Sequence, residues 1–119
     1  MRADELSGIH VEPGEGAVVV SLRGDIDAAL RDDASLAMAG ALVDGRPILI
    51  DATEATFVDS AGVAFVLQMH LAASEAGIPV TLLDPGRVLV GVLETLELAD
   101  AIAHERPDGS TAATPDRVA

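Results

Sequence analysis

Apolar and polar positions along the chain predict short strands that alternate with helices. Residues 9–12 and 17–23 are short runs with many β-branched side chains, and the turn sequence at residues 13–16 joins them as a hairpin. The Gly-Asp-Ile-Asp segment at residues 24–27 ends the second strand and supplies a capping carboxylate. A helix is therefore expected over residues 28–43.

The same alternation continues toward the C-terminus. Residues 48–51 form a strand of the buried type, a second helix covers residues 60–76, and residues 80–83 form the next strand. We expect a third helix over residues 87–95 and a short edge strand at residues 98–103. Because successive strands are joined through helices, the order predicts an α/β domain with a mixed sheet.

The length of 119 residues fits one domain, which we place at residues 1–104. Residues 105–119 are rich in Pro, Gly, Ser and Thr and contain few large apolar groups. Such a segment buries too little surface to offset the entropy of ordering, so we expect a disordered tail.

Composition excludes several classes of function. The formal net charge is −13, so phosphate backbones and anionic headgroups are repelled, and we expect neither a nucleic-acid partner nor membrane binding. The chain has no Cys, and all its cations besides His are Arg, which excludes a thiol nucleophile and a phosphate-loop lysine. It shows no signal peptide or apolar run long enough to span a membrane, so a cytoplasmic location is expected.

Residues 57–63, between a strand end and a helix start, hold the strongest candidate site. Ser60 lies at the helix N-cap or in its first turn, and Asp59 precedes it. Capping is the ordinary role of Asp and Ser at such a position, and a functional role is the alternative.

Other chemistry finds little support. His10, His70 and His104 are scattered without the spacing of metal ligands, and no metal site is expected. Asp51 and Asp59 could be imagined as a carboxylate pair, but no base or electrophile accompanies them.

The helix expected after Ser60 has two apolar faces. Val63, Val66, Leu67 and Leu71 form one, while Phe65, Met69, Ala72 and Ala76 form the other. Either neighbouring helices cover the second face, or it is an exposed partner patch centred on Phe65 and Met69.

Three segments resemble the landmarks of the STAS domain family, in the family's order. They are Gly-Asp-Ile-Asp at residues 24–27, Asp-Ser-Ala-Gly at residues 59–62 and Asp-Pro-Gly-Arg-Val at residues 84–88, and the resemblance covers residues 9–103. It implies a single STAS-like layer, with four to five strands and helices mainly on one face. The second hydroxyl residue that often follows the acceptor serine is Ala61 here.

The resemblance also implies an anti-sigma-factor antagonist, a bacterial regulator without enzymatic activity or cofactor. Its partner would be an anti-sigma factor with serine-kinase activity, bound while Ser60 is unphosphorylated, and the chain would be a monomer or weak dimer. A STAS scaffold subunit of a lipid-transport or sensory complex, without phosphorylation, is the alternative. The residues implied to bind the partner are Gly24, Asp25, Asp27, Asp59, Ser60, Ala61, Gly62, Val63 and Phe65.

Separate roles follow for some of these residues. Ser60 would accept the phosphate, and Asp59 would shape and charge the acceptor site. Gly62 would let the partner approach closely, while residues 24–27 would form the adjoining loop face.

Overall fold

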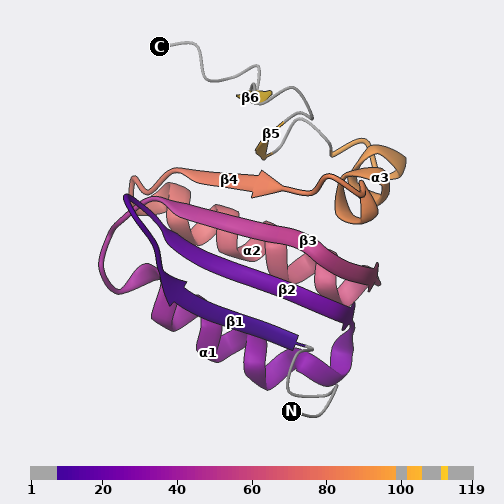
Figure 1. Ribbon diagram of the computed structural model, residues 1–119, viewed down its shortest axis with the longest axis horizontal. Coiled ribbons are helices and arrows are strands. Elements are labelled where there is room, and N and C mark those ends of the chain that lie inside the picture. Colours follow the sequence, from indigo (N-terminus) through magenta and orange to yellow (C-terminus); the bar gives the residue numbers. More distant parts are fainter. Residues whose placement is uncertain (1–7, 99–101, 106–110, 113–119) are drawn as a thin grey trace.

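The computed structural model describes residues 8–98, 102–105 and 111–112. Their strands form one mixed β-sheet in the order β1-β2-β3-β4-β5-β6, so neighbours in the chain are neighbours in the sheet. Helices α1 (Arg31–Leu42) and α2 (Ser60–Glu75) lie along the same face of this sheet (Figure 1). The predicted α/β class, with a mixed sheet and helices mainly on one face, is confirmed.

The first two strands form the predicted hairpin. β1 (Gly8–Pro13) pairs antiparallel with β2 (Val18–Ile26). At the turn, the Gly14 N–H donates to the Ala17 carbonyl oxygen over 2.8 Å. Arg46 lies in the loop between α1 and the strand that follows it. Its Nη2 donates to the Gly14 carbonyl oxygen over 2.6 Å, which joins the hairpin turn to this loop.

Two helical crossovers produce the parallel part of the sheet. The short 3₁₀ helix η2 (Ala28–Leu30) and α1 connect β2 to β3 (Ile48–Val58), and α2 connects β3 to β4 (Val80–Leu83). Both strand pairs are parallel, as the sequence predicts.

β2 and β3 run further than their sequences suggest. β2 was expected to end at Arg23 but continues to Ile26 through two irregularities, and Gly24 adopts a φ of 74° at the second of them. At each of the two shifts in register the extra residue lies in β3, so β3 bulges while β2 continues to pair and the expected break is absent. β3 was expected to end at Asp51 and instead reaches Val58, with these two bulges between Asp51 and Phe57.

The C-terminal elements also differ in part from expectation. Helix α3 (Val88–Thr95) agrees with the prediction, but the edge strand is β5 (Ala103–Glu105), which pairs parallel with β4. β6 (Thr111–Ala112) pairs antiparallel with β5. Within the described residues the sheet therefore has six strands, where four to five were expected. Residues 106–110 and 113–119 lie outside the described residues.

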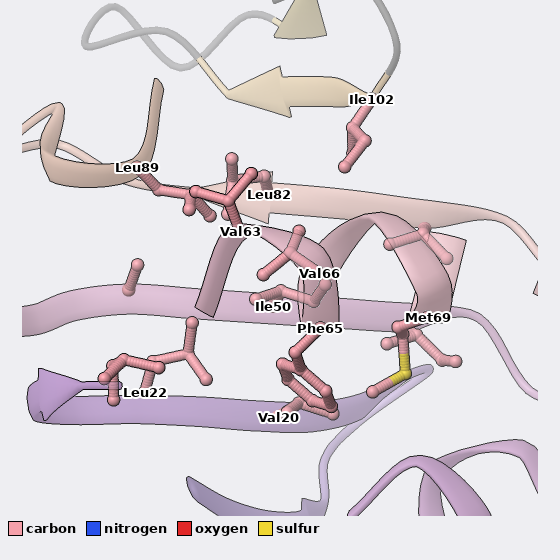
Figure 2. Packing of buried hydrophobic residues seen from close by; sticks show 14 of the residues in the cluster. Val20, Leu22, Ile50, Val63, Phe65, Val66, Met69, Leu82, Leu89 and Ile102 are labelled. Atoms are coloured by element: carbon pink, nitrogen blue, oxygen red, sulfur yellow. The ribbon is translucent and has the colours of Figure 1, made fainter. Parts of the chain in front are cut away.

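The core lies between the sheet and its helices. Alternate residues of β2 and β3, among them Val20, Leu22 and Ile50, face Val66 and Met69 of α2 (Figure 2). Phe65 is 5% exposed and Met69 is fully buried, so the exposed patch envisaged around these two side chains is wrong. Phe65 lies beside Val20 of β2, so the sheet covers this part of the second face where neighbouring helices were expected, and Ala76 of the same face is exposed (Figure 2).

Candidate functional site

Two of the three landmark segments meet at one edge of the sheet. β2 and β3 are parallel and end together, with Ile26 paired with Val58. The Asp59 N–H donates to the Ile26 carbonyl oxygen over 3.1 Å, which joins the two strand ends. Residues 24–27 therefore lie beside residues 59–62, as expected for adjoining loops.

Asp59 caps helix α2. Its Oδ1 accepts hydrogen bonds from the N–H groups of Ala61, over 2.9 Å, and Gly62, over 3.1 Å. Its backbone is extended, the usual conformation of an N-cap residue. Capping is thus complete without a contribution from Ser60.

Ser60 is the first residue of α2, and it is exposed. Within the described residues, neither its hydroxyl nor its N–H takes part in a hydrogen bond. The two interpretations of this segment therefore divide between two residues: Asp59 has the capping role, and the Ser60 hydroxyl is available for chemistry.

The structure explains the glycine at position 62 in a way that differs from the expected one. A β-carbon at this position would lie 2.7 Å from Val58 Cγ1 and 2.9 Å from the Ile26 carbonyl oxygen. Only a glycine lets the first turn of α2 approach the ends of β2 and β3 so closely. The groups that approach Gly62 are the Val58 side chain and the Ile26 carbonyl of the same chain, so the expected role of admitting a partner is not needed to explain this glycine.

Thr56 and Phe57, at the end of β3, are exposed and were not among the expected partner-binding residues. Phe57 is 52% exposed at the end of β3 and pairs with Asp25 across the sheet. The Thr56 hydroxyl donates to Asp25 Oδ1 over 2.9 Å. Phe57 directly precedes Val58 and Asp59, but its exposure depends on which face of an irregular strand it occupies, and the sequence pattern does not reveal this.

The remaining residues of the expected partner-binding set differ in exposure. Asp25 is exposed, Gly24 and Asp27 are half-buried, and Asp27 Oδ1 accepts a hydrogen bond from the Ala29 N–H over 3.0 Å. Ala61 is half-buried. Val63 and Phe65 are buried, so these two side chains belong to the core and not to an exposed surface.

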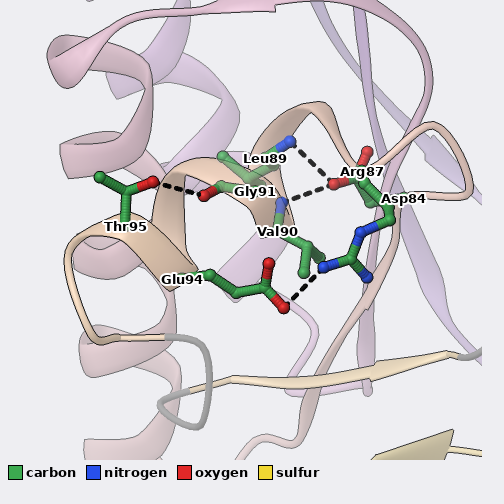
Figure 3. A network of polar contacts seen from close by, with 7 residues as sticks. All are labelled: Asp84, Arg87, Leu89, Val90, Gly91, Glu94 and Thr95. Carbon is green, nitrogen blue, oxygen red and sulfur yellow. Dashed lines mark hydrogen bonds and ion pairs between the residues drawn. The ribbon is translucent and has the colours of Figure 1, made fainter.

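The third landmark builds the start of α3. Asp84 is 4% exposed, and its Oδ2 accepts hydrogen bonds from the N–H groups of Leu89 and Val90 over 2.8 and 2.7 Å (Figure 3). Arg87 adopts a left-handed φ of 59° and pairs with Glu94 over 2.6 Å. The hydrogen bond and the charge of Glu94 raise the pKa of the Arg87 guanidinium above its ordinary value. β4 ends opposite Asp51, and α3 then packs against β3 and α2, with Leu89 beside Val63 in the core (Figure 2).

Carboxylates dominate the site around Ser60. Asp25, Asp27 and Asp59 all lie at the ends of β2 and β3. No three His, Asp or Glu side chains of the described residues are placed to hold a metal ion together. Among the described helices, none is long and apolar enough to cross a membrane.

The element order and sheet topology define a single-layer α/β fold that is shared with solved structures. An anti-sigma factor antagonist from Mycobacterium paratuberculosis superposes with a TM-score of 0.73 at 19% identity, covering 87% of this chain and 89% of that one. The anti-sigma factor antagonist SpoIIAA in its unphosphorylated form gives a TM-score of 0.61 at 22% identity, covering 85% of this chain and 90% of that one.

Sequence comparison gives the family. The family model described as "Mlab, STAS domain" matches residues 9–103. The chain therefore belongs to the STAS domain family, as its three landmark segments suggest. No curated protein sequence matches the chain.

Proposed function

We propose that this STAS domain is a cytoplasmic anti-sigma-factor antagonist that acts by binding and not by catalysis. In this proposal the unphosphorylated chain binds an anti-sigma factor with serine-kinase activity. Phosphorylation of Ser60 by that partner releases the complex and frees the anti-sigma factor to hold its sigma factor.

One observation carries the proposal: the Ser60 hydroxyl is exposed and uncommitted, because Asp59 alone caps α2. A serine that capped the helix would lose its hydrogen bond on phosphorylation, and the fold would be weakened. Here the modification can change the surface without removing any described hydrogen bond of the chain.

The local charges favour a change in binding over a change in fold. A phosphoserine adds about −1.5 to −2 charges. Asp59 already accepts the amide hydrogens of Ala61 and Gly62, so of the first-turn amides only that of Ser60 is left for a phosphate. A partner surface that fits a neutral hydroxyl among carboxylates would meet added bulk and charge, which at an interface costs several kcal/mol.

Substitution at two serines of the same helix tests the proposal. Wild type, Ser60→Ala, Ser60→Asp and Ser74→Asp would be immobilised and exposed to lysate of the native cell, and captured proteins identified by mass spectrometry. Ser74 is exposed near the other end of α2, so Ser74→Asp adds the same charge away from the site.

We expect wild type, Ser60→Ala and Ser74→Asp to capture the same anti-sigma factor, and Ser60→Asp to lose it. A penalty of about 3 kcal/mol corresponds to roughly a hundredfold weaker binding. Capture of one partner by all four proteins would contradict the switch. It would support the alternative, a scaffold subunit of a lipid-transport or sensory complex that keeps Ser60 unmodified.

A further inference from the structure

An elongated groove of about 740 Å³ runs between α1 and α2. Its α1 wall extends from Arg31 to Leu42, a distance of about 17 Å at the helical rise of about 1.5 Å per residue. The volume lies within the range of about 300 to 1,000 Å³ that is typical of small-molecule sites. The large apolar side chains that line the groove are Ile9, Ile26, Leu30, Met38, Leu42 and Phe65.

Small residues on both helices explain why this space is open. Ala34 and Ala39 of α1 line the same groove as Ala61, Gly62 and Ala64 of α2. Side chains of this size do not fill the space between two helices that rest on one sheet. Met38 adds a flexible thioether wall that adapts to an irregular apolar ligand.

One cation lies at the rim, and the fold does not use it. Arg31 lines the groove as the first residue of α1, where the helix dipole disfavours a positive charge. Arg23 pairs with Glu12, Arg46 binds backbone carbonyl groups and Arg87 pairs with Glu94. Among the arginine side chains of the described residues, only that of Arg31 makes no hydrogen bond or ion pair.

We propose that this groove binds a single-chain fatty acid, with the hydrocarbon chain between α1 and α2 and the carboxylate on Arg31. A guanidinium binds a carboxylate through two parallel hydrogen bonds, and the length and apolar lining of the groove suit a hydrocarbon chain. A helix of the same length and about 11 Å in diameter would fill roughly 1,600 Å³, more than twice the groove volume. The proposal does not depend on Ser60 being phosphorylated.

Titration of the ¹⁵N-labelled full chain with dodecanoate, followed by NMR, tests the site. We expect saturable binding with shifts at groove residues such as Ala34, Met38 and Ala64. Arg31→Gln should weaken dodecanoate binding by about tenfold but leave binding of the neutral dodecanol unchanged, because only the charged head contacts the arginine. Arg23→Gln is the matched control, since Arg23 does not line the groove and should not affect either ligand.

Filling the groove gives an independent test. Ala64 is exposed on α2 and lines the groove, so Ala64→Leu should block both ligands, while Ser74→Leu on the same helix should not. If Ala64→Leu fails to fold, Ala39→Leu on the α1 wall provides the same block.

Absence of saturable binding below the micellar concentration would overturn the proposal. Equal affinity of wild type for dodecanoate and dodecanol would overturn the role of Arg31, and binding unchanged by either filling variant would overturn the location.

Discussion

Gly62 lies so close to Ile26 that a β-carbon on the glycine would be 2.9 Å from the Ile26 carbonyl oxygen and 3.0 Å from its Cγ2 atom. Real β-carbons essentially never approach a backbone atom within 3.0 Å. The same Ile26 carbonyl accepts the Asp59 N–H, so this contact fixes the start of α2 against the end of β2. The exposure of Ser60 follows from the placement of that helix turn.

Gly62→Ala is therefore expected to destabilise the fold. Overpacking a buried site typically costs about 1–3 kcal/mol in the free energy of unfolding. Gly40→Ala is the matched control, because Gly40 lies in α1 and a β-carbon added there would meet no heavy atom within 4 Å. The control should gain about 0.5–1 kcal/mol from helix propensity. Urea unfolding measures both, and a Gly62→Ala protein as stable as Gly40→Ala would contradict the close contact.

The sequence predicts where the site lies but not which of its residues caps the helix. The order of strand and helix places Asp59 and Ser60 at a helix start, and this is where the structure has them. Both residue types cap helices, so the sequence pattern does not decide which one accepts the amide hydrogens. That choice depends on the backbone path, which the Asp59 hydrogen bond to Ile26 fixes across the sheet.

Burial was harder to predict than the elements themselves. The apolar period of α2 identifies Phe65 as part of an apolar face, but only the packing of the helix on the sheet shows that the fold covers it. Phe57 lies in the candidate segment 57–63, but its exposure was not predicted. Its own strand, β3, has an extra residue at each of two shifts in register with β2, so simple alternation does not give the face of the side chain.

Asp59→Ala and Ser60→Ala should separate folding from function. Removing the Asp59 cap should lower the free energy of unfolding by about 1 kcal/mol, within a usual range of about 0.5–2. Ser60→Ala should change it by less than about 0.5 kcal/mol, because the hydroxyl makes no hydrogen bond within the described chain. Chemical denaturation of the two variants checks this, and a Ser60→Ala loss as large as that of Asp59→Ala would mean that the serine is structural.

Phe57 is expected to contribute to partner binding if the proposed function holds. Exposed aromatic side chains with polar neighbours are typical anchors of interfaces, and removing one commonly costs at least about 1–2 kcal/mol of binding energy. Phe57→Ala should thus weaken binding of the captured anti-sigma factor by about tenfold or more. Leu71→Ala is the control, since Leu71 is 60% exposed near the other end of α2. Calorimetry that finds equal affinities for both variants would place the interface elsewhere.

The ends of α2 and α3 share one backbone motif but differ in a key residue. After α2, the Ile78 N–H donates to the Ala73 carbonyl over 2.8 Å, and Gly77 has a φ of 76°. After α3, the Leu98 N–H donates to the Leu93 carbonyl over 2.7 Å, and the equivalent left-handed residue is Glu97, with a φ of 60°. Glycine is the preferred residue at this position because a β-carbon is strained there.

Glu97→Gly should accordingly stabilise the protein, and Gly77→Ala should destabilise it. Relief of the left-handed strain is partly offset by the greater freedom of glycine in the unfolded chain, so we expect a gain of about 0.5–1 kcal/mol for Glu97→Gly. Gly77→Ala should lose a similar amount, since no heavy atom within 4 Å adds a steric penalty to the backbone strain. Thermal and urea unfolding of the two variants measure this, and changes of the same sign would show that the two helix ends are not energetically equivalent.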